Sequence, residues 1–485
     1  MLPPVTQDFL DIVMDVVDPA VAEAERNPPR LGADGEVEFD PAYHRAGRAV
    51  WASGIVAAPP REQASLFYAL AHAGEGGHAC PVVCTAGLVR ALRTRAADEL
   101  CDRFLPPLLE TDYERAQRGA QFLTERHGGS DVGANRVEAV PEGETWRLHG
   151  EKWFCSVADA DQFVVTARPR GAPPGTRGIG CFLVPREGGG FRIRRLKDKL
   201  GTRALATGEI EFDGAVGYPL GPLEEGFRTA VGVLNTSRWL NAVGSSGLMR
   251  RAYLVASGFA GERTAFGQTI VEFPLVREHL AVMKTEADAS LASTLELTEL
   301  VARMDEGTAS EDDVAWHRVL VNANKMVTSL AATRAVRRGI EVLGGNGTIE
   351  DFSPLPRLWR DAIVFESWEG THNVLCAQVL RDLGRMDAVG LAAARSGASE
   401  ELAARLQRSV AEPAFGALHI RRQLDELVRS LQVKALRSSG EPDSAELIER
   451  RHLIAGWNPE ADTDYPALLD RVLGPADASG DPNPL

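Results

Sequence analysis

The chain has 485 residues, 44% of them hydrophobic, so it can bury a large core and is neither disordered nor fibrous. Its formal charge of −15 argues against broad nucleic-acid affinity, because binding to phosphates needs a clustered positive field. The cysteines form no CxxC pair, and we interpret even Cys80 and Cys84 as reduced, buried thiols rather than zinc ligands. We expect no metal site.

The N-terminal residues 1–27 lack a basic segment and carry acids within their apolar run, so we expect no signal peptide. No stretch of the chain reaches the roughly 20 uninterrupted apolar residues that a membrane span requires. The sequence therefore predicts a soluble, cytoplasmic protein.

Residues 1–119 are predicted to form a helical domain. Near its start, apolar residues recur at the spacing of one face of an amphipathic helix: Phe9, Ile12, Val13, Val16, Val17 and Val21. Further helices are predicted in Ala- and Leu-rich segments with short breaks, near 41–56, 61–73, 81–93 and 95–107.

Residues 120–220 consist of short apolar runs bounded by glycine, proline and aspartate, which predict an antiparallel sheet or small barrel. The helical period returns over 221–385, with one helix through 280–295 and another over 311–343 that ends at Gly344. Residues 386–475 are predicted to add a further helical segment. The last residues, 476–485, are predicted to be a disordered tail.

Short motifs that carry glycines, hydroxyls and acids follow the predicted domains in order. Each is weak alone; glycine, for instance, lets a ligand approach the backbone but also suits an ordinary turn. The motifs are TERHGGSD (124–131), GEKWFCS (150–156), ERTAFG (262–267), VLGGNG (342–347) and SWEGTHN (367–373). As an ordered set they resemble the signatures of the acyl-CoA dehydrogenase family.

The resemblance implies an α+β, acyl-CoA dehydrogenase-like fold. Its parts are an N-terminal helical domain, a middle β-barrel or sheet domain, and a C-terminal four-helix bundle with an extra C-terminal helical segment. The runs RLKDKLGTRA (195–204) and WEGTHNVLCAQVLR (368–381) resemble the AidB-like branch, named for an alkylation-response flavoprotein with an added C-terminal helical domain.

The resemblance also implies FAD as the cofactor, with contacts carried over by motif. Residues beside the flavin ring would be Gln121, Leu123, Thr124, Gly129, Ser130, Phe154 and Ser156. Residues that hold the pyrophosphate and adenine from a neighbouring subunit would be Arg263, Phe273, Glu341, Gly344 and Gly345. Thr371 and Asn373 would complete the cofactor site.

The implied reaction is α,β-dehydrogenation of an acyl-CoA thioester. Glu369 matches the family's base and would remove the α-proton, flavin N5 would take the β-hydride, and backbone N–H groups would polarise the thioester oxygen. Glu366 has no matched role. The implied substrate contacts are Ser130, Asn235, Arg238 and Gly370.

Two positions depart from relatives within the family. The isovaleryl type draws its base from a helix position just before an arginine, and here that position is Ser237, which cannot serve as a base. Asn235 replaces the usual aspartate that contacts CoA. The base role therefore falls to Glu369.

The implied partners are an electron-transfer flavoprotein as acceptor and further copies of the chain in a dimer or tetramer, within fatty acid metabolism. Two alternatives stay open. One is a DNA-associated, AidB-like protective flavoprotein, although residues 391–460 hold ten basic and ten acidic residues and so carry no net charge. The other is a biosynthetic desaturase or oxidase that acts on a carrier-protein thioester.

Overall fold

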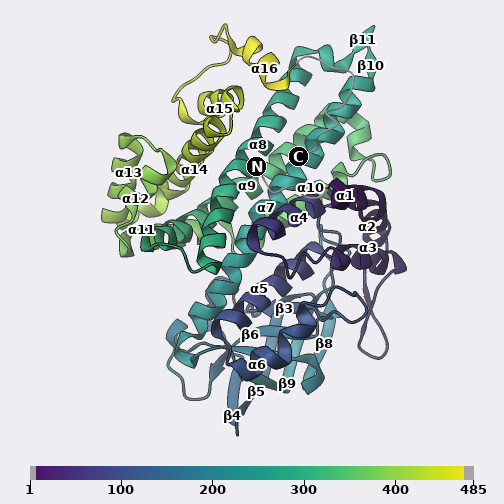
Figure 1. Ribbon diagram of the computed structural model, residues 1–485, viewed down its shortest axis with the longest axis vertical. Helices are drawn as coiled ribbons and strands as arrows, with labels where there is room; N and C mark the ends of the chain where they lie inside the picture. The colour runs from purple at the N-terminus through teal and green to yellow at the C-terminus, as the bar shows by residue number, and fades with distance from the viewer. Residues whose placement is uncertain (1–6, 475–485) are drawn as a thin grey trace. The chain divides into compact units, whose positions relative to one another are not determined.

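The computed structural model describes residues 7–474 (Figure 1). Their contacts divide the chain into two compact units, with the boundary along the chain between residues 240 and 241. The tail predicted at 476–485 lies outside the described residues. None of the helices in residues 7–474 is both long and apolar enough to cross a membrane.

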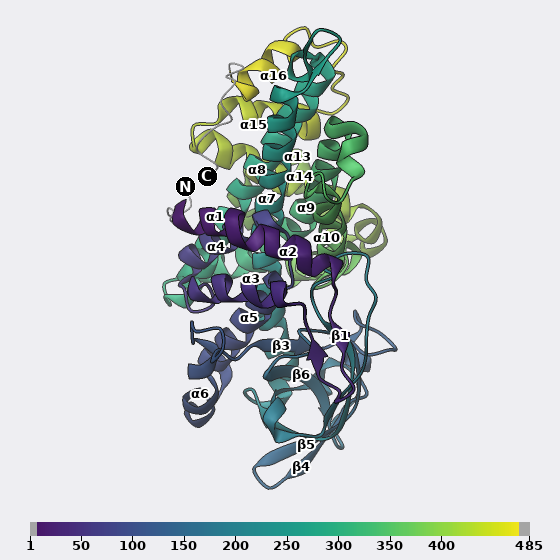
Figure 2. The same ribbon diagram turned by 90° about the vertical axis from the view of Figure 1, so that its right-hand side faces the viewer.

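The first unit begins with helices, as the sequence predicts. They are α1 (Gln7–Ile12), the π-helical η1 (Val13–Val17), α2 (Asp18–Arg26), α3 (Pro41–Ala52), α4 (Pro60–Leu70), α5 (Ala79–Arg95) and α6 (Asp98–Phe104). Figure 2 shows α2 and α3 side by side, and α5 packs against the first strand of the sheet.

The predicted face of the first helical stretch is wrong at two positions. Ile12 and Val16 are 41% and 45% exposed. The buried residues instead recur every four positions, at Phe9, Val13, Val17 and Val21. The reason is the π-helical turn over 13–17, whose wider winding aligns residues four apart.

The sheet of the first unit has seven strands. They are β3 (Gly119–Phe122), β4 (Glu138–Glu142), β5 (Thr145–Ser156), β6 (Gln162–Pro169), β7 (Gly180–Pro185), β8 (Phe191–Leu196) and β9 (Thr207–Pro219). Their order is β3-β6-β4-β5-β9-β7, with β8 beside β9, and an added β6–β7 pairing closes a small barrel. The barrel is mixed rather than antiparallel, because β6 pairs in parallel with both β3 and β4 across long connections.

Helix α7 (Gly226–Glu262) belongs to both units along its length. The second unit continues with the hairpin of β10 (Thr264–Ala265) and β11 (Gln268–Thr269), then α8 (Pro274–Asp305), α9 (Glu311–Leu343), α10 (Leu355–Ser367) and α11 (His372–Arg385). Helix α9 has the predicted bounds, because a capping box at Ser310 begins it and Gly344, at φ 62°, ends it. Its neighbours include α8, α10 and α11.

The extra C-terminal segment is helical, as predicted. It comprises α12 (Val389–Ser396), α13 (Glu400–Ala411), α14 (Pro413–Ser438), α15 (Pro442–Ile448) and α16 (Tyr465–Leu473). Helices α14, α15 and α16 lie along α8 (Figure 1), where small residues such as Ala281 and Ala289 admit Leu447 and Leu436. The segment thus shares its core with the second unit.

Candidate functional site

A buried lysine holds the TERHGGSD segment in the first unit. Lys152 on β5 donates to the carbonyl of Leu123 at 3.1 Å and to Glu125 Oε1 at 2.9 Å. Burial lowers the pKa of Lys152, while the charge of Glu125 opposes that shift. Glu125 also accepts the backbone N–H groups of Arg136 and Val137, at 2.6 and 3.1 Å. The segment after β3 is therefore fastened at its first acid.

The TERHGGSD and GEKWFCS segments form one continuous surface. The N–H of Trp153 donates to the carbonyl of Thr124 at 2.9 Å, which places β5 directly beside the segment. On the same strand Phe154 is 55% exposed, although it is aromatic, and the Ser156 hydroxyl lies 3.1 Å from that of Thr207.

Exposed small residues border this surface. Gly129 and Ser130 are exposed, and Thr124 is half-buried. A side chain at Gly128 would meet no heavy atom within 4 Å. An exposed ring, hydroxyls and open space beside Gly128 suit a flat ligand that is apolar on its face and polar at its edge, as an isoalloxazine ring is.

The remaining predicted residues of the first unit meet on α7. Gln121 on β3 donates to the Ser237 hydroxyl at 3.0 Å. Arg238 is 3% exposed and donates to Asn235 Oδ1 at 3.1 Å. The structure therefore brings Gln121 to the helix that carries both predicted CoA contacts.

Glu369 lies in a sharp turn between α10 and α11. Its φ is 56°, in the left-handed region that side chains other than glycine rarely adopt, and the φ of Gly370 is 110°. Glu369 and Gly370 are half-buried. Thr371 is the N-cap residue of α11, and both it and Asn373 are exposed. Such a conformation costs on the order of 1–3 kcal/mol and persists only where the surroundings impose it.

Two residues that the sequence interpretation did not assign hold this turn. Lys325 on α9 is fully buried and donates to the carbonyls of Glu366 and Gly370, at 2.7 and 3.4 Å. Glu366, predicted to have no role, accepts the Thr333 hydroxyl at 2.5 Å. The one signal in the sequence was a lone lysine within a helix whose neighbouring residues are mostly uncharged.

The residues predicted for the pyrophosphate and adenine lie at the other end of α9. Glu341, Gly344 and Gly345 are exposed at its C-terminus, and Glu341 Oε1 is 3.7 Å from His279 Nε2 on α8. By the ordinary helical rise, α9 spans roughly 24 Å between Lys325 and Glu341. One chain therefore does not bring this group to Glu369.

The last predicted pair, Arg263 and Phe273, flanks the hairpin that follows α7. Arg263 is exposed, and Phe273 is half-buried just before α8. At the tip, Phe266 is 98% exposed with a φ of 53°, and its ring centroid is 6.3 Å from that of Phe273. A phenylalanine held in strained backbone and turned to solvent is suited to contact another chain.

Three family models match the chain in order. Residues 18–115 match the Adaptive response protein AidB N-terminal domain, 120–215 the Acyl-CoA dehydrogenase middle domain, and 224–384 the Acyl-CoA dehydrogenase C-terminal domain.

Curated relatives agree with these matches. The chain is 34% identical over 396 residues to Putative acyl-CoA dehydrogenase AidB of Escherichia coli (strain K12), which covers 76% of the chain and 71% of that protein. It is 36% identical over 320 residues to Acyl-CoA dehydrogenase family member 11 of Caenorhabditis elegans, which covers 62% of the chain and only 51% of that protein.

A solved structure has the same fold over most of the chain. The crystal structure of Caenorhabditis elegans ACDH-11 in complex with C11-CoA matches with a TM-score of 0.80 at 26% identity. The match covers 95% of this chain and 85% of that one.

Proposed function

The chain belongs to the acyl-CoA dehydrogenase family, and we propose that it oxidises an acyl thioester across its α and β carbons with FAD as cofactor. The observation that carries this proposal is the geometry of Glu369. A half-buried carboxylate in strained backbone, held by a turn whose carbonyls bond a buried lysine, is a typical arrangement for a catalytic group.

In the proposed reaction Glu369 takes the α-proton on a carboxylate oxygen. The backbone N–H of Glu369 donates to the thioester oxygen, which gains negative charge as the proton leaves. Bound FAD supplies the acceptor for the hydride that leaves the β-carbon. Electrons and atoms balance, because one proton and one hydride leave and a double bond forms.

The cofactor fits the residues present. Phe154 and Ser156 on β5, with Thr124 and Ser130, would lie along the ring, and the open space at Gly128 leaves room for its edge. Leu123 and Gly129 would border it through backbone groups. Thr371 and Asn373, exposed at the start of α11, would complete the site.

A second copy of the chain would supply the other end of the cofactor site. Arg263 and Phe273, with Glu341, Gly344 and Gly345, would hold the pyrophosphate and adenine of FAD bound by a neighbouring subunit. The exposed Phe266 and the length of α9 between Lys325 and Glu341 support this arrangement. We therefore propose a dimer or tetramer.

The proposed substrate is an acyl-CoA, with Arg238, Asn235, Ser130 and Gly370 as contacts, and the proposed electron acceptor is an electron-transfer flavoprotein. The C11-CoA complex of the worm relative supports an acyl-CoA. A carrier-protein thioester stays an alternative, because Asn235 replaces the usual aspartate. Comparing matched CoA and carrier-protein thioesters of one acyl group would decide between them.

Flavin bleaching tests the proposal directly. The purified protein should be yellow, and its flavin band should bleach anaerobically when an acyl-CoA of suitable length is added. Glu369→Gln should keep the flavin and lower turnover by at least about 10³-fold, because general-base catalysis is lost. The matched variant Glu366→Gln should keep most of the turnover. Equal activity of both variants would overturn the assignment of the base.

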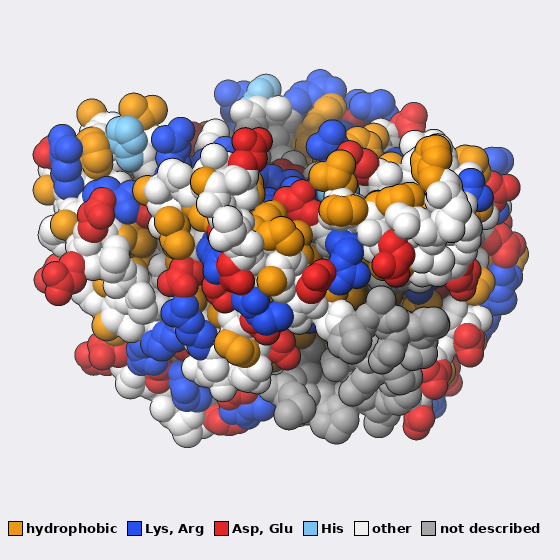
Figure 3. Space-filling model, turned by 90° about the horizontal axis from the view of Figure 1, so that it is seen from above, with side chains coloured by type: hydrophobic (Ala, Val, Ile, Leu, Met, Phe, Trp, Pro, Cys, Tyr) orange, Lys and Arg blue, Asp and Glu red, His pale blue; other side chains and the backbone are white. Residues whose placement is uncertain are grey.

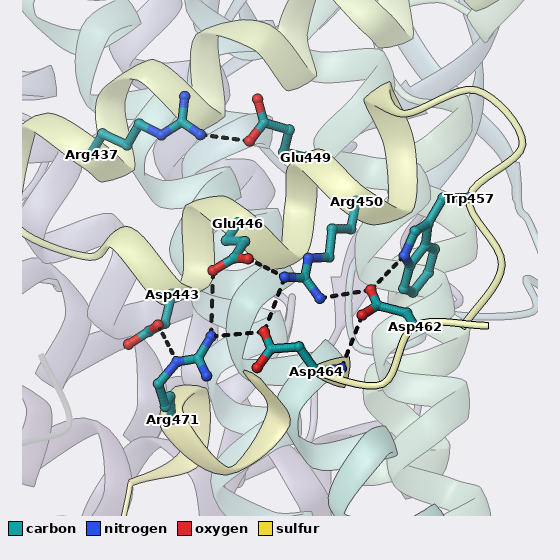
Figure 4. Close-up of polar contacts among 9 residues, drawn as sticks. All are labelled: Arg437, Asp443, Glu446, Glu449, Arg450, Trp457, Asp462, Asp464 and Arg471. Carbon is teal, nitrogen blue, oxygen red and sulfur yellow. Dashed lines mark hydrogen bonds and ion pairs between the residues drawn. The ribbon is translucent and has the colours of Figure 1, made fainter. Parts of the chain in front are cut away.

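A role on DNA is the second candidate, suggested by the AidB relative. Several cations of the C-terminal segment are, however, engaged in ion pairs: Arg450 contacts Asp462 at 2.6 Å and Asp464 at 3.1 Å, and Arg471 contacts Asp443 at 2.8 Å (Figure 4). On the face in Figure 3, acidic and basic side chains are interspersed. Gel shifts at several salt concentrations should detect only weak binding; a steep salt dependence of tight binding would favour DNA.

A further inference from the structure

We propose that Lys325 is a positioning residue that holds the turn of Glu369 in its productive conformation and sets the charge beside it. The inference rests on the proposed function, since it assumes that Glu369 is the base. Lys325 lies on α9, 44 positions before Glu369 in the sequence, and it belongs to none of the motifs.

The first support is the burial of the lysine. The side chain is 0% exposed and is among the largest fully buried side chains of the described residues. A buried ammonium group is costly unless it is well hydrogen-bonded. A neutral, apolar side chain would suit a mere space-filling role better, so the charge has a use at this point.

The second support is the identity of its acceptors. Glu366 belongs to the last turn of α10, where carbonyls have no partner within the helix. Gly370 lies just past Glu369. Lys325 therefore bonds the chain on both sides of the base, at 2.7 and 3.4 Å. Each bond opposes relaxation of the left-handed φ of 56° at Glu369.

The third support is the electrostatic setting. A cation at the end of α10 compensates the negative end of the helix dipole. The charged and titratable groups around this turn come from four helices: Lys325 and Arg334 on α9, Glu366 on α10, His372 on α11 and Arg421 on α14. Burial and then the charges of Lys325 and Arg421 lower the pKa of His372 to about 4. His372 is thus neutral near pH 7, and it adds no positive charge to that of Lys325 at this turn.

The test compares three variants of the full-length, FAD-loaded protein. Lys325→Met removes the charge and keeps the length of the side chain. Lys325→Arg keeps the charge. Asn324→Ala is the matched control: Asn324 is also fully buried on α9 but bonds Ser293 and Thr294 on α8, at 2.7 and 3.0 Å, away from the turn.

Two readouts separate positioning from general stability. In Lys325→Met, kcat should fall about 10- to 100-fold with a smaller change in KM. The acid limb of the profile of kcat/KM against pH should move to higher pH, because a cation that favours the charged form of Glu369 is gone. Backbone amides of residues 366–371 should exchange hydrogen faster. Lys325→Arg should restore the position of the acid limb, and Asn324→Ala should change neither readout.

An unchanged acid limb and unchanged exchange in Lys325→Met would overturn the inference, as would equal effects in Asn324→Ala. Should Lys325→Met fail to fold, Lys325→Arg decides alone: an acid limb and exchange rates like those of the wild type support the inference, and an acid limb displaced as if the charge were absent overturns it. If none of the thioesters tested bleaches the wild-type flavin, the proposed function fails. The hydrogen exchange of the backbone amides of residues 366–371 then still decides whether Lys325 holds the turn.

Discussion

Lys152 and Lys325 are both buried, yet the two units of the chain accommodate them differently. In the first unit Lys152 forms an ion pair with Glu125 at 2.9 Å, and that carboxylate is itself buried, at 6% exposure. In the second unit Lys325 donates to the main-chain carbonyls of Glu366 and Gly370. Each lysine fastens one of the motifs on which the proposed reaction depends.

The two lysines differ in which groups would lose a partner if the lysine were replaced. Without Lys152, the negative charge of Glu125 would be buried beside apolar residues, which is strongly unfavourable. Without Lys325, the carbonyls of Glu366 and Gly370 on either side of the proposed base would lose a charged donor. Lys152 should therefore matter most for the stability of its unit, and Lys325 most for the conformation of one turn.

The largest expected effect on stability belongs to Lys152→Met. We expect it to lower the free energy of unfolding by about 3–5 kcal/mol, because one partner of a buried ion pair is removed. The measurement is urea unfolding of the FAD-loaded protein. Arg192→Met is the control, since the ion pair of Arg192 with Glu211 is largely exposed and should contribute at most about 1 kcal/mol. Similar losses in both variants would contradict the distinction between buried and exposed pairs.

The double variant Lys152→Met with Glu125→Gln sharpens that expectation. The glutamine amide leaves no buried charge, and its single oxygen can still accept one of the two N–H groups, those of Arg136 and Val137, that bond the carboxylate. We expect the double variant to be more stable than Lys152→Met alone by about 1–3 kcal/mol. If Glu125→Gln only added to the loss, the carboxylate would not be the source of the instability.

Lys325→Met should lower the free energy of unfolding by about 1–3 kcal/mol, because the main-chain carbonyls of Glu366 and Gly370 lose a charged donor. Its effect on turnover should exceed that of Lys152→Met once both proteins are loaded with FAD and folded. The measurements are urea unfolding and anaerobic flavin bleaching on the same samples. A loss of stability equal to that of Lys152→Met would remove the contrast between the two lysines.

Local signals explain which elements were predictable from the sequence. Helix α9 was predicted at its observed bounds, because the glycine at 344 ends it within the sequence itself. The parallel pairing of β6 with β3 and β4 was not predictable, because strand pairing depends on residues far apart in the chain. The buried face of the first helical stretch was predicted wrongly, because a π-helical turn changes the number of residues per turn that the apolar pattern assumes.

The site was predictable only through its motifs. Glu369 was singled out by resemblance, but neither its left-handed φ nor its bonded turn follows from the letters SWEGTHN. Lys325 was missed because α9 is covered on several sides, by α8, α10, α11 and α14, so no single stripe marks its buried face. From the sequence alone, a single lysine in such a helix is interpreted as a solvent-exposed charge.

The smallest expected effect concerns pH. The pKa of His372 is lowered from 6.5 to about 4, first by burial and then by the charge of Lys325. Between these values the unfolded chain binds more protons than the folded one, so the contribution of His372 to stability is complete above about pH 6.5 and is lost as the pH falls towards 4.

We expect the loss to be about 1 kcal/mol. Lys325→Met should make the loss smaller, since one cause of the lowered pKa is removed, and His372→Gln should abolish it. Urea unfolding of the three proteins between pH 4 and 7 measures these slopes. A slope that is the same with and without Lys325 would mean that burial alone lowers the pKa of His372, and that the charge of Lys325 does not reach the start of α11.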